Sequence, residues 1–121
     1  MRRCAGGAYH LRIPEDAVIP ADKVTGYLLA PRPWDDKSRF LARGGFTRDK
    51  PEALHQALRE LARSAPAVED GANEYGLFLR QDGELTGPRG RALPVTLIWL
   101  RWHLDGTVHL VTVKPRRRYK G

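Results

Sequence analysis

The side chains best suited to chemistry lie in two β-rich runs near the end of the sequence, where His103 follows Arg101 by two positions. An imidazole exchanges protons near neutral pH, and a guanidinium or ammonium group stabilises the charge that builds on a phosphate. RNA cleavage without a metal needs a base for the 2′-hydroxyl, an acid for the leaving oxygen and a cation. We therefore nominate His103, Arg101 and Lys37 as candidate catalytic residues.

A second set of side chains could bind the substrate of such a reaction. Aromatic rings stack on nucleobases, and hydroxyl, guanidinium and ammonium groups hold phosphate oxygens. The candidates are Trp99, Thr112, Tyr75, Lys114, Arg116, Arg117 and Arg118.

Metal and cofactor sites are not indicated. The four histidines have no ligand-like spacing, and the one cysteine, Cys4, has no partner for an internal disulfide. The glycine pair at 44–45 lacks the Lys-Ser/Thr that follows a phosphate-binding loop. We expect no metal and no cofactor.

The runs at 93–104 and 107–113 flank the dipeptide Asp-Gly, the strongest short-range signal for a two-residue hairpin turn. Such a turn places Trp99 opposite Thr112. Because side chains alternate along a strand, we expect one face to be apolar and to pack on the core: Ile98, Leu100, Trp102 and Leu104. The other face is mixed, and is either an ordinary solvated face or a catalytic surface: Trp99, Arg101, His103 and Thr112.

Helical patterns precede these strands. We expect a short helix at about 21–29 and another within 34–46, the second begun by Asp35 or Asp36 and followed by Gly44 at its C-terminal end.

The clearest helical pattern covers about 51–65. Its apolar residues recur at helical spacing, and Thr47 or Asp49 is expected to cap it, because Asp49 and Glu52 have the spacing of a capping box.

Residues 68–73 have the small and acidic composition of a loop. Strand character begins near 74, and either continues to Thr86 as one strand or turns back as a hairpin at Asp82-Gly83. The order of elements predicts an α+β domain with N-terminal short helices packed on one face of a three- or four-stranded antiparallel β-meander.

A chain of 121 residues is expected to form one domain. We divide it into a flexible arm (1–12), an α+β domain (13–115) and a basic tail (116–121). Of its 21 basic residues, seven lie in the two ends, and the remaining 14 balance the 14 acidic ones. The net charge of +7 therefore lies in the ends, where it either adds phosphate affinity or only solubilises the protein.

No apolar run approaches the roughly 18 residues of a membrane span. We expect no membrane association. The expected location is the cytoplasm, unless the chain is the delivered module of a larger exported protein.

Short motifs run in a fixed order through residues 18–115. They are Lys-x-x-Phe at 37–40, Gly-Phe at 45–46, Tyr-Gly at 75–76, Leu-Thr-Gly-Pro-x-Gly at 85–90, Trp99, and Leu-Val-Thr at 110–112. This pattern resembles an uncharacterised bacterial domain family found in phage-related proteins and in the C-terminal toxin modules of polymorphic toxin systems. The acidic pair at 35–36 and the basic tail depart from the family pattern.

Small ribonuclease toxins of the RelE, barnase and colicin type also have their helices before their antiparallel strands. This similarity is an analogy of fold alone. The resemblance implies a toxin-like domain, with RNA as the substrate and an acidic immunity or antitoxin protein as the partner. Three hypotheses follow: a metal-independent ribonuclease, a non-catalytic module that binds nucleic acid or protein, and a domain with no role in nucleic-acid biology.

Overall fold

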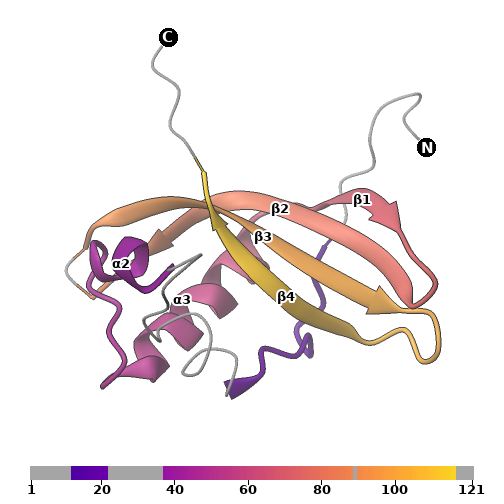
Figure 1. Cartoon of the computed structure of the whole chain (residues 1–121), viewed down its shortest axis with the longest axis horizontal. Helices are drawn as coiled ribbons and strands as arrows, with labels where there is room; N and C mark the ends of the chain where they lie inside the picture. Colours follow the sequence, from indigo (N-terminus) through magenta and orange to yellow (C-terminus); the bar gives the residue numbers. More distant parts are fainter. Residues whose placement is uncertain (1–11, 22–36, 89, 117–121) are drawn as a thin grey trace, which may run out of the picture.

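The computed structural model describes residues 12–21, 37–88 and 90–116. Antiparallel strands form one sheet in sequential order (Figure 1): β1 Val68–Ala72, β2 Gly76–Thr86, β3 Ala92–Trp102 and β4 Val108–Pro115. The labelled helices are α2, Lys37–Ala42, and α3, Pro51–Ser64. The predicted α+β class and antiparallel sheet are confirmed. Residues 1–11 and 22–36 lie outside the described residues. They include most of the arm predicted at 1–12 and most of the helix predicted at about 21–29.

Helix α3 has the predicted amphipathic pattern and packs through its apolar stripe. Its buried residues are Leu54, Ala57, Leu58, Leu61 and Ala62. The predicted cap is wrong: the N-cap residue is Lys50, which makes no side-chain capping bond, and Pro51 opens the helix. Pro51 has no N–H, so this end of the helix has one donor fewer to satisfy. Neither described helix is long and apolar enough to cross a membrane.

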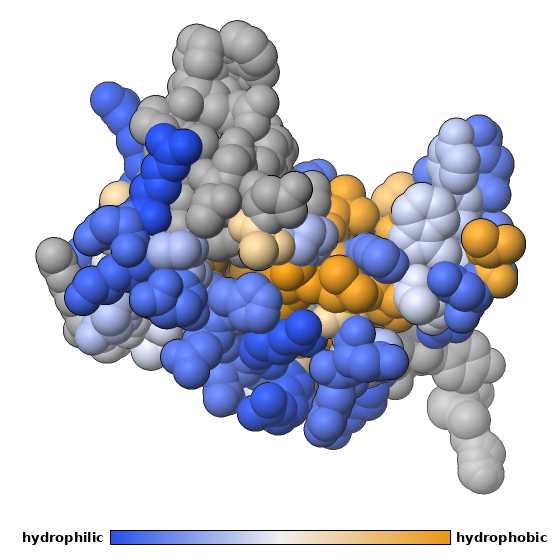
Figure 2. All heavy atoms as spheres, turned by 90° about the horizontal axis from the view of Figure 1, so that it is seen from below, coloured by the Kyte–Doolittle hydropathy of each residue, from blue (hydrophilic) through white to orange (hydrophobic). Residues whose placement is uncertain are grey.

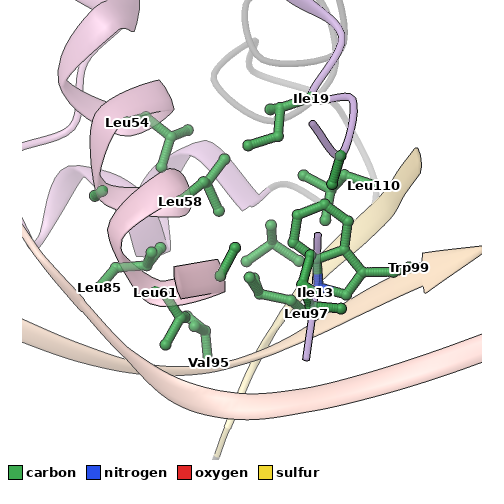
Figure 3. Packing of buried hydrophobic residues seen from close by; sticks show 14 of the residues in the cluster. Ile13, Ile19, Leu54, Leu58, Leu61, Leu85, Val95, Leu97, Trp99 and Leu110 are labelled. Carbon is green, nitrogen blue, oxygen red and sulfur yellow. The ribbon is translucent and has the colours of Figure 1, made fainter. Parts of the chain in front are cut away.

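Apolar side chains of α3 and of the sheet share one buried core. Figure 3 shows Leu54, Leu58 and Leu61 of α3 directed towards side chains of β2, β3 and β4. The segment 12–21 closes this core with Ile13, Ala17 and Ile19, each at most 5% exposed. The same segment is fixed to the edge of the sheet, because Val18 N–H donates to the Val108 carbonyl at 2.8 Å. Seen from below, much of the described surface is hydrophilic, and apolar atoms show in the middle of the view and in a separate group at its right edge (Figure 2).

Helix α2 ends in a Schellman motif. The N–H of Phe46 donates to Leu41 O at 3.2 Å, and the N–H of Gly45 donates to Ala42 O at 2.9 Å. The left-handed residue is Gly45, with φ of 91°, and not Gly44 as predicted. Leu41 and Phe46 are both buried, so the motif carries the chain from α2 into the core.

The sheet differs from the sequence prediction at 68–72 and decides between the two alternatives left open for 74–86. The segment 68–72 is strand β1 and not a loop, although four of its five residues are exposed. It pairs with β2 as an edge strand, so backbone pairing and not an apolar face holds it in place. Strand β2 runs unbroken to Thr86 with continuous pairing to β3, which excludes the hairpin at 82–83.

The predicted register of the β3–β4 hairpin is wrong. Trp102 pairs with Thr107, through Trp102 N–H to Thr107 O at 2.8 Å, and the loop between them has four residues. The Asp105 carboxylate accepts the Thr107 N–H at 3.0 Å and its hydroxyl at 2.7 Å. This local turn competes with the two-residue turn and shifts the pairing by two residues, so that His109 lies opposite Leu100.

The two faces of the hairpin are also the reverse of the prediction. Trp99, on the expected outer face, is fully buried, and Leu97 and Leu110 are buried with it. Trp102 is half-buried on the opposite face, and Leu104 is 91% exposed in the turn. Residues 97–100 are all apolar, so their alternation could not decide which face is inside. A bulge after Leu110 then moves Thr112 to the outer face, opposite Ile98 and away from Trp99.

Candidate functional site

The residues nominated from sequence do not form one site. Trp99 lies in the core, where its Nε1–H donates to Gln81 Oε1 at 3.1 Å, so it cannot stack on a substrate. Thr112 and Lys114 lie on the outer face, opposite Ile98 and Thr96. Thr96 and Trp102 are six positions apart on β3, so this end of the sheet lies about 20 Å from Trp102.

Arg116 is held at the same end as Lys114. It donates from Nε to Val95 O at 3.3 Å and from its terminal nitrogen to Gly83 O at 3.0 Å. Lys37 is the first residue of α2, but its side chain lies outside the description, as do Arg117 and Arg118.

Two nominated residues lie beside each other at the hairpin end of the sheet. The backbone N–H of His103 donates to Tyr75 O at 2.9 Å, and both side chains are exposed. Arg101 is also exposed, opposite Leu77 and Val108, on the face that turns towards the core. The hairpin end thus keeps three of the predicted site residues.

A more organised group lies at this end, and we call it the tip cluster: Tyr75, Trp102, Asp105, Thr107 and His109. The Trp102 ring contacts Tyr75 on one side and His109 on the other, both edge to face. The centroid distances are 6.0 and 5.9 Å, within the range of favourable aromatic pairs. Tyr75 is 56% exposed, so one end of this aromatic row is open to solvent.

A chain of hydrogen bonds orients His109. The Thr107 hydroxyl donates to Asp105 Oδ1 at 2.7 Å. The Thr107 hydroxyl oxygen also lies 3.0 Å from His109 Nε2. A hydroxyl has one proton to donate, so Thr107 accepts from His109, and Nε2 of the neutral ring carries the hydrogen. This assignment leaves Nδ1 as the nitrogen that can take up a proton, which is the arrangement required of an oriented general base.

Trp102 contributes a buried donor to the same cluster. Its Nε1 atom is buried and has no hydrogen-bond partner among the described residues. An unpaired buried donor costs about 1–3 kcal/mol.

His109 is not among the residues nominated from sequence, because the predicted two-residue turn pairs it with Trp102 on the face expected to pack on the core. The available signal was the spacing Asp105-x-Thr107-x-His109. An Asp followed two residues later by Thr favours a side-chain-to-backbone turn, and alternate residues of a strand share a face.

The Asp105 carboxylate gives a prediction about pH. The Thr107 backbone N–H and then the Thr107 hydroxyl hold the pKa of Asp105 below its usual value of 3.8. Because the folded-state pKa is lowered, its stabilising effect is complete above pH 4 and is lost as the pH falls through the folded-state value. We expect Asp105→Asn to lose stability relative to the wild type at pH 6, and the difference to shrink below pH 4.

Urea unfolding measured from pH 6 to pH 2.5 tests this expectation. Thr107→Val removes the hydroxyl but keeps the backbone N–H, and should show a weaker pH dependence than the wild type. A wild-type-to-Asn difference that stays constant down to pH 2.5 would contradict the role given to Asp105.

Within the described ranges, no three side chains of the His, Cys, Asp and Glu types lie together as metal ligands. The tip cluster itself presents an imidazole, which can transfer a proton, and aromatic rings, which can stack.

The fold and the tip cluster define a class: a small α+β domain with an antiparallel sheet whose hairpin end carries an oriented histidine beside aromatic rings. The family model of DUF6883, a domain of unknown function, matches residues 10–117, and the chain belongs to this family. No curated protein and no solved structure matches the chain.

Proposed function

We propose that this domain binds single-stranded RNA at its hairpin end and cleaves it without a metal. The observation that carries the proposal is the Asp105–Thr107–His109 hydrogen-bond chain set against the Trp102 and Tyr75 rings. An oriented imidazole beside an exposed aromatic ring combines a general base with a stacking surface.

In the proposed reaction His109 accepts the proton of the 2′-hydroxyl, and the 2′-oxygen attacks the adjacent phosphorus. The 5′-oxygen leaves and takes a proton from His103, which gives a 2′,3′-cyclic phosphate and a 5′-hydroxyl. Arg101 lies at the same end of the sheet but on the inner face of β3, so it takes no part in this step. Tyr75 offers its exposed ring to a neighbouring base.

The outer face of the sheet supplies a path for the rest of the strand. Half-buried side chains lie along it in the observed register: Phe78, Ile98, Trp102, His109 and Thr112. Lys114 is exposed at the far end, where its charge suits a phosphate. As part of the same proposal, the helices lie together on the inner face and leave this outer face open.

Incubation of the purified chain with single-stranded RNA in excess chelator tests the proposal. We expect products with a 2′,3′-cyclic phosphate, and no cleavage of the matching DNA, which lacks the attacking hydroxyl. His109→Ala should lower the rate about 10²- to 10⁴-fold, the usual contribution of a general base. His55→Ala, in α3, is the matched control and should cleave at the wild-type rate.

No cleavage by the wild type, or equal rates for wild type and His109→Ala, would sink the ribonuclease proposal. Fluorescence anisotropy with a labelled RNA separates binding from cleavage in the same samples.

A non-catalytic binding module is the second candidate function. Tyr75 at 56% and Leu104 at 91% exposure place two large apolar side chains in solvent at the hairpin end, which is typical of a contact surface. If RNA binds without being cleaved, and Tyr75→Ala weakens the binding about 5- to 100-fold, this candidate replaces the first.

The proposed biological setting is a toxin-like module of a phage or toxin–antitoxin system, acting in the cytoplasm. An acidic immunity or antitoxin protein that covers the hairpin end would be its partner.

A further inference from the structure

A cavity of about 280 Å³ lies between the segment 12–15 and the second half of α3. Three guanidinium-bearing side chains line it, together with an apolar floor and one acidic residue. The lining residues are Arg12, Arg59, Arg63, Ile13, Pro14, Ala62 and Glu15. The tip cluster contributes no residue to this lining, so the cavity is a separate feature of the molecule.

Two of the three arginines are anchored but not neutralised. Arg12 donates to Arg63 O at 3.3 Å, and Arg59 donates to the main-chain oxygen of Glu15 at 3.2 Å. Each anchor uses one of five N–H donors of a guanidinium. Among the described residues neither arginine has a carboxylate within ion-pair distance. Arg63 pairs with Glu60 at 3.5 Å, but both side chains are more than half exposed, and such surface pairs are weak.

The end of a helix is ordinarily unfavourable for an anion, because its last carbonyls carry partial negative charge. Here three of the last four carbonyls of α3 accept hydrogen bonds from side chains. Gln81 Nε2 donates to the carbonyl oxygens of Leu61, Ala62 and Ala65, and Arg12 covers that of Arg63. The excess positive charge of the arginines therefore faces the cavity with little opposition from the helix.

We propose that this cavity binds an organic phosphate, with the phosphate group held by Arg12, Arg59 and Arg63. Planar guanidinium groups match phosphate oxygens in pairs of parallel hydrogen bonds. Ile13 and Ala62, both about 5% exposed, give the floor an apolar surface for the body of the ligand. A nucleoside monophosphate has both a phosphate group and a body that can lie on an apolar surface.

Titration of the isotope-labelled chain with inorganic phosphate, with a nucleoside monophosphate and with succinate tests the proposal by amide chemical shifts. We expect shifts at Ile13 and Ala62 with both phosphates, tighter binding of the nucleotide, and at least tenfold weaker binding of succinate. Arg59→Gln should weaken phosphate binding at least tenfold. Arg59→Lys keeps the charge but loses the paired hydrogen bonds, so its phosphate affinity should fall between that of the wild type and that of Arg59→Gln.

The matched control is Arg48→Gln, an exposed arginine outside the cavity, which should bind as the wild type does. Thermal unfolding of each variant shows whether the segment 12–15 stays attached. Shifts at other amides only, equal binding by Arg59→Gln and wild type, or succinate binding as tight as phosphate would each overturn the proposal.

Discussion

Replacing Gln81 by leucine is expected to lower the free energy of unfolding by about 3–4 kcal/mol, because the change orphans several buried polar groups at once. Gln81 is fully buried on β2, and its amide joins the end of α3 to Trp99. Its Nε2 donates to Ala65 O at 2.6 Å and shares its second hydrogen between Leu61 O and Ala62 O, both at 3.3 Å. Its Oε1 accepts from Trp99.

Leucine would fill similar space but leave the Trp99 indole N–H and the helix carbonyls without partners in the core. In a domain of this size the expected loss lowers the melting temperature by about 10–20 °C. Differential scanning calorimetry of wild type and Gln81→Leu measures it directly.

The matched control is Thr96→Val, which breaks another polar contact between β2 and β3. The Thr96 hydroxyl donates to Asp82 Oδ1 at 2.6 Å, but on the exposed face, where water replaces the lost bond. Its cost should stay below about 1 kcal/mol. Equal melting temperatures for Gln81→Leu and Thr96→Val would show that the buried amide has no special role.

Replacing Gly76 by alanine is expected to disturb both stability and the tip cluster. Gly76 lies opposite Trp102, and an added Cβ would fall on the carbonyl oxygen of Arg101 and within 3.0 Å of Leu100 Cδ1. A backbone oxygen cannot turn aside as a flexible side chain can, so β2 and β3 must separate at this point. We expect a loss of about 2–4 kcal/mol and displacement of the Trp102 ring from Tyr75 and His109.

Near-ultraviolet circular dichroism reports the tryptophan environment, and thermal unfolding reports the stability. Gly71→Ala in β1 is the control, since nothing lies within 4 Å of its added Cβ and only its φ of 94° is strained. That change should cost about 1 kcal/mol and leave the tryptophan signal unchanged. A native tryptophan spectrum in Gly76→Ala would refute the close approach of the two strands.

Local patterns in the sequence were sufficient for the α3 helix and the long strands. The apolar stripe of α3 faces only one way, so its spacing alone identifies the buried side, and Leu54 and Leu58 are buried as expected. By contrast, β1 carries no apolar alternation, and its exposed residues become a strand only because β2 offers a backbone to pair with.

The candidate site shows the same division. Three residues nominated from sequence, Tyr75, Arg101 and His103, lie at the hairpin end, and each was nominated from its residue type, which is a local property. Sequence reasoning missed His109, whose orientation depends on the turn that Asp105 forms with Thr107.

By itself the sequence determined the α+β class, the amphipathic helix and the existence of the last hairpin, since each follows from spacing within a short segment. Only the tertiary structure decided which face of that hairpin is inside. Residues 97–100 are all apolar, so contacts from distant segments decide between the two faces: Gln81 on β2 binds the buried Trp99, and Tyr75 packs on Trp102.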